Sequence, residues 1–238
     1  MTTVRELTAS LDWTHQGTGL FLSALARMPD DALDGPSALP GWTGRHLLAH
    51  VAANAEALLN LAHWAATGIE TPMYASPQQR DADIGSGARR SPGELRAWVE
   101  ESASRLWTAL GALTDAQWSQ TVRTAQGRLV AATEIPWLRA REVMVHAVDL
   151  DPGLDFAALP RGFLLALVED IVERRSSGDQ PALVLAADAG AHTWSVLGRG
   201  EPIQVTGSLG GVAAFLAGRP RTDVRAAVGA VPELPPWL

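Results

Sequence analysis

The chain has 238 residues, of which 47 % are hydrophobic and 19 % are charged, a balance typical of a globular protein with an ample core. Its formal net charge of −7 at pH 7, without any basic run, argues against a nucleic-acid-binding surface. Cysteine and lysine are both absent, which excludes disulfides, thiolate metal ligands, a cysteine nucleophile and a lysine Schiff base. Any thiol chemistry therefore needs a thiol from outside the chain.

No stretch follows the pattern of a secretory signal, and no uninterrupted apolar run is long enough to span a bilayer. We therefore expect a cytoplasmic protein that binds neither membranes nor nucleic acid. We expect it to act as a monomer or a small homo-oligomer.

Residues 4–28 show the periodicity of a long amphipathic helix, with core positions at alternating steps of three and four. The expected core stripe is Val4, Leu7, Leu11, Thr14, Thr18, Phe21, Leu25 and Met28. Gly17 and Gly19 either weaken the helix locally or allow a neighbouring element to approach closely. Pro29 and the loop after it end the helix.

A second helix is expected from Thr43, just after a Pro-Gly-Trp sequence, to about Gly68, a plausible stop. Its inward face should include Leu47, His50, Val51, Asn54, Leu58 and Leu61. Two polar side chains thus interrupt an apolar stripe, and buried polar groups of this kind are usually hydrogen-bonded structural residues. His50 is equally placed to act as a metal ligand. His46, one turn earlier, forms a rival pair with it, and periodicity does not choose between the two.

Residues 69–90 are expected to form a long loop without regular structure, and such loops are often functional. The loop contains Arg80 and Tyr74, the one tyrosine of the chain. The sequence Ser91-Pro92-Gly93-Glu94 then predicts the start of a third helix, with Ser as N-cap and Glu at the third position. Its buried face should consist of Leu95, Trp98, Val99, Ser102, Leu106, Leu110 and Leu113.

Residues 114–132 are expected to form a connection with a short hairpin around Gln126-Gly127. A fourth helix is expected at residues 133–150, with Pro136 in its first turn, where a missing N–H costs little. Four amphipathic helices joined in this way suggest a four-helix bundle. The core of such a bundle can build metal sites from side chains on facing helices.

Glu142 and His146 lie four residues apart in the fourth helix, so their side chains share one face about one turn apart. A carboxylate and an imidazole in this relation can share a divalent metal. Because Glu-x-x-x-His is a common spacing, a surface pair worth a few tenths of a kcal/mol is the alternative. In a bundle core, His50 could supply the third ligand, and the residues alone leave both interpretations open.

Asp151-Pro152-Gly153 marks the expected domain boundary, which gives a bundle over residues 1–151 and a smaller domain over residues 152–238. A helix at about residues 160–175 precedes three β-prone runs at residues 182–187, 193–197 and 203–206. A short helix at residues 208–217 and a last strand at residues 223–228 complete a small α+β domain.

Six segments together resemble the mycothiol-dependent maleylpyruvate isomerases, within the wider DinB-like metalloprotein superfamily. They are GWTGRHLLAHVAANAEAL (41–58), TGIETPMYASPQQR (67–80), TAQGRLV (124–130), WLRAREVMVHAVDL (137–150), VTGSLGGVAAFLAGR (205–219) and the ending VPELPPWL. The resemblance spans nearly the whole chain. It implies a DinB-like four-helix bundle with a smaller C-terminal α+β domain, the layout already expected from the periodicity.

The resemblance also implies a site. In this family a His of the second helix and the Glu and His of the fourth helix bind zinc, and these correspond to His50, Glu142 and His146. The corresponding histidine is that of the AHVA segment, so the resemblance selects it over His46. An arginine that follows the TPMY segment serves the active site in the family, and Arg80 occupies that position.

The implied cofactors are Zn²⁺ and mycothiol, and the implied reaction is the cis–trans isomerisation of maleylpyruvate to fumarylpyruvate, as in the degradation of aromatic compounds. It would proceed by thiolate addition, bond rotation and elimination, with a dicarboxylate substrate and a low-molecular-weight thiol as partners. A bidentate arginine suits such a substrate. The alternatives are a mycothiol S-transferase acting on another electrophile, and a bundle that senses metal or thiol without turnover.

The remaining polar residues near these segments have weaker assignments. Asn54 could hold substrate, thiol or a water molecule, or could be a buried structural amide. Tyr74 could line the site or fix the loop. Arg139 and Arg141 flank Glu142 and are expected to be solvated or to lie at a domain interface.

Overall fold

The computed structural model describes residues 5–176, 180–221, 223–235 and 237. The chain divides into two compact units, one over Glu6–Pro152 and one that includes Gly153–Leu238 and Arg5. Arg5 joins the second unit, where its guanidinium lies 3.5 Å from the carboxylate of Asp170. The domain ranges expected from the sequence had placed Arg5 in the first unit.

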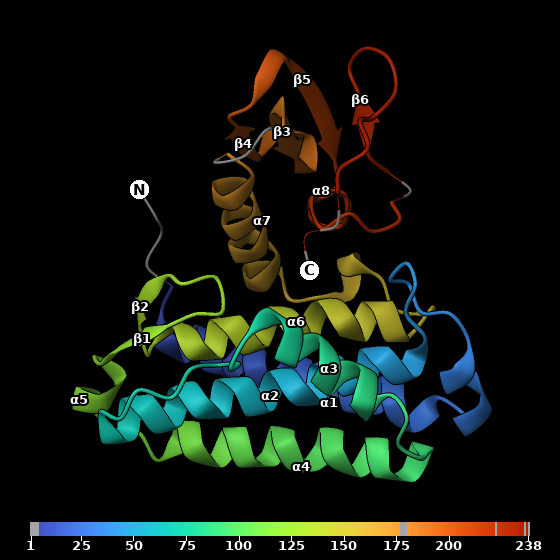
Figure 1. Ribbon diagram of the computed structural model, residues 1–238. Coiled ribbons are helices and arrows are strands. Elements are labelled where there is room, and N and C mark those ends of the chain that lie inside the picture. The colour runs from blue at the N-terminus through green and yellow to red at the C-terminus, as the bar shows by residue number, and fades with distance from the viewer. Residues whose placement is uncertain (1–4, 177–179, 222, 236, 238) are drawn as a thin grey trace. The chain divides into compact units, whose positions relative to one another are not determined.

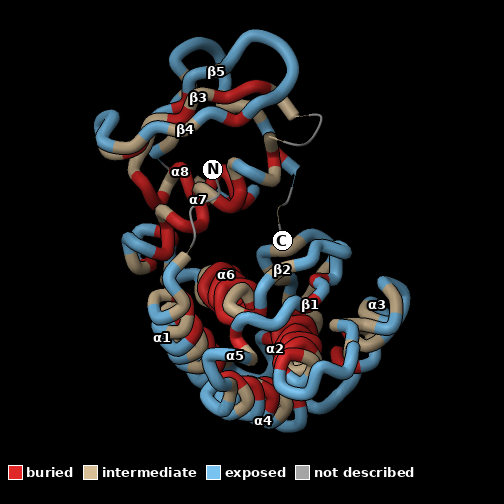
Figure 2. The backbone as a smooth tube through the Cα atoms, turned by 90° about the vertical axis from the view of Figure 1, so that its left-hand side faces the viewer, coloured by how far each residue is buried: buried red, intermediate tan, exposed pale blue. Residues whose placement is uncertain are grey.

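Within the described residues of the first unit, four long helices form the expected bundle (Figure 1). They are α1 (Leu7–Arg27), α2 (Gly44–Thr67), α4 (Pro92–Gly111) and α6 (Glu134–Leu150). Figure 2 looks along them and shows that α1 packs mainly on α6, while α2 packs on both α4 and α6. α1 and α4 contact each other little. The site described below lies between α2 and α6.

The helix ends follow the capping signals of the sequence. Thr43 and His46 form a capping box at the start of α2, and Gly68 ends this helix in a left-handed conformation with φ of 74°. Ser91 and Glu94 form the expected capping box of α4. Nδ1 of His46 therefore accepts a hydrogen bond from the main-chain N–H of Thr43 at the start of the helix.

The predicted core stripe of α1 is confirmed in part: Thr14, Phe21 and Leu25 are buried. The half-buried members are Leu7, Leu11, Thr18 and Met28, and Val4 lies outside the described residues. Gly17 allows α1 to approach α6, because a Cβ at this position would lie only 2.7 Å from a methyl group of Val143. No such contact exists at Gly19.

The expectation of a structureless loop over residues 69–90 is wrong, because the segment contains helix α3 (Pro77–Gly87). Ser76 caps it by accepting a hydrogen bond from the N–H of Gln79 at 3.0 Å, and Pro77 occupies the first turn. The helix is polar and mostly exposed, so it has little apolar periodicity to detect. These capping residues were the available signal.

The connection between α4 and α6 contains a short helix and the predicted hairpin, with Gly127 at φ of 80° in its turn. Its elements are α5 (Asp115–Trp118), β1 (Thr121–Arg123) and β2 (Leu129–Ala131). A single 3₁₀ turn, η1 (Asp30–Asp34), lies between α1 and α2. Among the described residues, no helix is both long and apolar enough to cross a membrane.

The second unit has the expected α+β composition, with a four-stranded sheet in the order β4-β3-β5-β6 among the described residues. β3 pairs parallel with β5 and antiparallel with β4, and β6 pairs antiparallel with β5. Its elements are η2 (Phe156–Ala158), α7 (Arg161–Arg175), β3 (Pro181–Ala187), η3 (Asp188–Gly190), β4 (His192–Val196), β5 (Arg199–Gly207), α8 (Leu209–Leu216) and β6 (Arg225–Ala226).

Candidate metal centre

Three side chains from two facing helices converge in the bundle core. His50 projects from α2, and Glu142 and His146 project from α6. Nε2 of His50 lies 3.0 Å and Nε2 of His146 lies 3.3 Å from the same oxygen, Oε2 of Glu142. One ligand atom from each of the three side chains lies within 4.8 Å of the other two, and all three residues are buried. The spacing is what a single metal ion would need.

The local sequence explains this convergence. The four-residue spacing of Glu142 and His146 places both on the face of α6 that meets α2. His50 lies on the inward face of α2, and every residue of the face listed from the sequence is buried. The rival His46 is engaged instead by Thr43, whose Oγ1 lies 2.8 Å from its Nδ1.

The three groups differ in protonation because burial and their mutual contacts act in opposite directions. Burial alone would raise the pKa of Glu142, but the neighbouring imidazoles of His146 and His50 hold it well below its ordinary value. Burial lowers the pKa of His50 and outweighs the opposing effect of Glu142. A carboxylate facing a neutral imidazole is the state that a divalent metal requires.

His146 carries the observation that best fits a metal. Its Nδ1 lies 2.8 Å from a carboxylate oxygen of Asp149. Burial alone would lower the pKa of His146, but the carboxylates of Asp149 and Glu142 outweigh burial and raise it. Its Nε2 is buried and finds no hydrogen-bond partner within the described part of the chain. A carboxylate on one ring nitrogen fixes the tautomer and directs the other nitrogen towards a metal. The donor set therefore fits zinc or a similar divalent ion, with positions left open.

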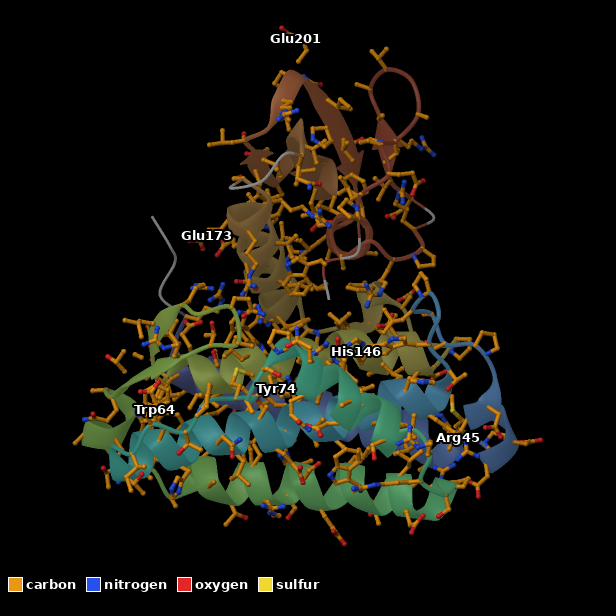
Figure 3. The ribbon with its side chains drawn as sticks, in the orientation of Figure 1. Arg45, Trp64, Tyr74, His146, Glu173 and Glu201 are labelled. Atoms are coloured by element: carbon orange, nitrogen blue, oxygen red, sulfur yellow. The ribbon has the colours of Figure 1, made fainter. Side chains whose placement is uncertain are left out.

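Tyr74, in the segment before α3, and Arg80, in the first turns of α3, extend the site. Figure 3 labels Tyr74 and His146. Nη2 of Arg80 lies 3.5 Å from Nδ1 of His50, and its Nη1 pairs with Asp81 at 3.1 Å. Burial and the charge of Glu142 raise the pKa of Tyr74 to about 12, against the opposing influence of Arg80. The structure thus brings both sequence-predicted residues to the ligand cluster, with the phenol neutral at physiological pH.

Arg139 is not solvated, contrary to expectation, because only 1 % of its surface is exposed. It lies one turn before Glu142, and its Nη1 donates to the main-chain oxygen of Val51 at 2.7 Å and to Oδ1 of Asn54 at 2.9 Å. Burial lowers the pKa of Arg139 to about 10, so it remains a cation at neutral pH. Arg141 is also buried. The error came from treating both residues as immediate neighbours of Glu142, although a three-residue spacing places Arg139 on the same face.

Sequence reasoning missed two further participants. Asp149 lies three residues after His146, and this spacing on a helix was a usable signal for a carboxylate behind a histidine ligand. Trp42 lies edge-on to the ring of His50, with ring centroids 5.4 Å apart. Helical spacing could not predict this contact, because Trp42 lies in the loop before α2 and not in the helix itself.

Comparisons with known proteins identify the relatives of this chain. The family model described as the mycothiol maleylpyruvate isomerase N-terminal domain matches residues 14–151. The crystal structure of a mycothiol-dependent maleylpyruvate isomerase shares 38 % sequence identity with a TM-score of 0.94, covering 98 % of each chain. A histidine-to-alanine mutant of a mycothiol-dependent maleylpyruvate isomerase matches to the same extent. No match was found among curated proteins.

The family model covers most of the bundle, and the structural likeness extends over both units at an identity well above the level at which fold alone is shared. The chain is therefore a member of an enzyme family, and it belongs to the mycothiol maleylpyruvate isomerase family.

Proposed function

We propose that the chain catalyses the zinc- and mycothiol-dependent cis–trans isomerisation of maleylpyruvate to fumarylpyruvate. The observation that carries this proposal is the convergence of His50, Glu142 and His146 next to a cationic side chain, Arg80. Membership of the family and the likeness to a mycothiol-dependent maleylpyruvate isomerase supply the thiol and the substrate.

His50, Glu142 and His146 would hold the metal, with Asp149 fixing the orientation of His146. Zinc bound there would lower the pKa of a coordinated thiol, so that mycothiol could add reversibly as a thiolate to the double bond and allow rotation. The chain has no cysteine to compete for the ion. The ligand carboxylate is already ionised, since the pKa of Glu142 is lowered.

Arg80 and Tyr74 would bind and orient the dicarboxylate. A guanidinium can grip a carboxylate through two parallel hydrogen bonds and can stabilise negative charge that develops during the reaction. With a pKa of about 12, Tyr74 keeps its proton and can donate a hydrogen bond. The pair therefore offers an anion-binding surface beside the metal ligands.

Asn54 would contribute a further donor. Its Oδ1 accepts a hydrogen bond from Arg139, so its amide N–H₂ group is turned away from that guanidinium. Asn54 is only 4 % exposed. An amide donor one turn after His50 is suited to an oxygen of the substrate or of the thiol.

The test measures zinc content and maleylpyruvate isomerisation, with and without mycothiol, in the wild type, His50→Ala and His63→Ala. His63 is an exposed histidine on the same helix and serves as the matched control. We expect near-stoichiometric zinc and thiol-dependent turnover in the wild type and in His63→Ala. Both should be lost in His50→Ala.

The other outcomes separate the competing functions. Zinc binding with faster thiol transfer to an uncharged electrophile than isomerisation would indicate a mycothiol S-transferase. Zinc binding without turnover of any electrophile would indicate a sensor. Absence of zinc from a metal-preserving preparation would contradict the metal centre itself.

A further inference from the structure

Arg139 and Asn54 form a polar pair next to the metal-ligand candidates. Nη1 of Arg139 donates a hydrogen bond to Oδ1 of Asn54 at 2.9 Å. His50 and Glu142 pair across the same two helices at 3.0 Å. From one pair to the next the residue numbers rise along α2 and fall along α6, so the helices run antiparallel and the pairs lie about one turn apart. The Arg139–Asn54 pair is therefore the layer adjacent to the ligand candidates.

This layer borders the apolar half of the helix pair. One turn further along each helix, Leu58 and Ile135 already belong to the apolar cluster. Only 1 % of Arg139 is exposed, and burial lowers its pKa, while the charge of Glu142 opposes that shift. The cation is compensated, but an apolar side chain of similar volume often stabilises such a layer as well or better. Stability alone is therefore a weak reason for a guanidinium at this position.

The guanidinium determines which end of the Asn54 amide faces it. Arginine only donates hydrogen bonds, whereas an amide has an oxygen that accepts and a nitrogen that donates. The atom of Asn54 that faces Arg139 must be the oxygen, because the opposite orientation would set two donors against each other. The N–H₂ group of Asn54 is thus held on the other side of the amide.

A second hydrogen bond fixes the guanidinium itself. Nη1 of Arg139 also donates to the main-chain oxygen of Val51 at 2.7 Å, and this nitrogen carries one N–H for each of its two acceptors. Val51 directly follows His50 in α2. The guanidinium is therefore anchored to the helix backbone beside a metal-ligand candidate, and its hold on the amide does not depend on the Asn54 side chain alone.

We propose that Arg139 is a positioning residue, which holds the Asn54 amide so that its N–H₂ group donates to an oxygen of the ligand at the metal centre. Maleylpyruvate and mycothiol both offer such an oxygen, and their separate KM values distinguish them. The inference rests on the proposed function and deepens it, because it gives a role in that reaction to a buried cation that no step there uses.

The first test is a double-mutant cycle of Arg139→Met and Asn54→Ala, with steady-state kinetics of the zinc-loaded proteins. Each single substitution should lower kcat/KM by about 10–100-fold, as expected when one hydrogen bond to the ligand is lost. The double variant should lose no more than Asn54→Ala alone, because Arg139 acts through that amide. A rise in KM for maleylpyruvate assigns the oxygen to the substrate, and a rise in KM for mycothiol assigns it to the thiol.

Arg141→Met is the matched control. Arg141 is also buried in α6, but its two-residue spacing from Arg139 places it on another face of the helix. Its replacement should leave kcat/KM per folded, zinc-loaded molecule unchanged, both alone and in combination with Asn54→Ala.

Asn54→Asp tests the N–H₂ group without removing Arg139. The new carboxylate still accepts a hydrogen bond from the guanidinium, so the variant should fold, which urea unfolding would show. Because it has no N–H₂ group, its kcat/KM should fall as far as that of Asn54→Ala.

The mobility of the amide gives a readout that needs no turnover. The chain has two asparagines, Asn54 and Asn60, so ¹⁵N-asparagine labelling gives two side-chain N–H₂ groups, and Asn60 serves as the internal reference. The order parameter of the Asn54 group should fall from about 0.85 in the wild type to below about 0.6 in Arg139→Met, and should not change in Arg141→Met. The order parameter of Asn60 should be the same in all three proteins.

Three results would overturn the proposal. They are a double variant whose loss is the product of the two single losses, an Asn54→Asp variant with wild-type kcat/KM, and an Asn54 order parameter that does not change in Arg139→Met. Absence of isomerisation by the zinc-loaded wild type would refute the proposed function instead, and the order parameters would then still test the hold of Arg139 on Asn54.

Discussion

The two halves of the α2–α6 pair bury very different side chains, although the same two helices form both. Towards the C-terminal half of α2 and the start of α6, the interface is an apolar cluster that includes Leu58, Leu61, Ile135 and Leu138. Along the same two helices, the other half buries polar and charged residues: His50, Asn54, Arg139, Glu142, His146 and Asp149.

This difference separates stability from function along one helix pair. Apolar burial contributes roughly 25 cal/mol for each Å² removed from water, whereas buried charges stabilise little unless every polar atom is satisfied. At the polar end, Nε2 of His146 stays unsatisfied in the described part of the chain. The apolar half therefore holds the helices together, and the polar half retains an incomplete arrangement that a metal can complete.

The largest expected effect on stability lies in the apolar half. Leu61→Ala should lower the free energy of unfolding by about 2–5 kcal/mol, because Leu61 is fully buried and the change leaves a cavity. Turnover per folded, zinc-loaded molecule should stay unchanged. Urea unfolding measures the first quantity, and the exposed Leu129→Ala should change it by less than about 0.5 kcal/mol. A large loss of turnover in folded Leu61→Ala would contradict the assignment of stability to the apolar half and of function to the polar half.

In the polar half, Arg80→Lys should lower kcat/KM for maleylpyruvate by about 100-fold, since lysine cannot form two parallel hydrogen bonds to a carboxylate. Zinc content should not change, because Arg80 contacts His50 without being a ligand candidate. Arg89→Lys is the matched control, as Arg89 is exposed and donates to a main-chain oxygen of α3. Unchanged kcat/KM in Arg80→Lys would remove this residue from the site.

Asp149→Asn should weaken zinc affinity by about 10–100-fold with little loss of fold, because the histidine then lacks a carboxylate behind it. Competition with a chromogenic chelator measures the affinity directly. Asp12→Asn, at an exposed position of α1, provides the control. Equal affinities in the two variants would show that Asp149 serves only the fold.

The smallest expected effect is a pH dependence of the metal-free protein. Because the pKa of Glu142 is lower in the folded than in the unfolded chain, its contribution to stability is present above the ordinary pKa and is lost as pH falls through the folded value. The difference in unfolding free energy between the wild type and Glu142→Gln should therefore shrink as the pH is lowered from about 7 to below about 4.5. A difference that does not vary with pH would contradict the ionised state of Glu142.

The same comparison explains what the sequence could predict. Apolar periodicity and capping residues such as Ser91 and Gly68 act locally, so the long helices, the bundle and the inward position of His50 were predictable. Glu142 and His146 could be paired by their spacing, but only the resemblance to a family made them a metal site.

The remaining features depend on tertiary packing. The burial of Arg139 requires α2 to present a main-chain oxygen and Asn54 opposite it, which no pattern within α6 reveals. Helix α3 was missed because its polar sequence gives no periodic signal, although Ser76 and Pro77 mark its start. Arg5 lies with the second unit and pairs with Asp170, a contact between residues far apart in the sequence.

The most direct test of the central claim is anomalous diffraction at the zinc edge from crystals of the zinc-loaded protein. The account predicts one zinc ion bound by Nε2 of His50, Nε2 of His146 and the carboxylate of Glu142, with zinc–nitrogen distances of about 2.0–2.1 Å. A structure in which zinc is held by other residues, or in which this cluster stays empty at saturating zinc, would contradict it.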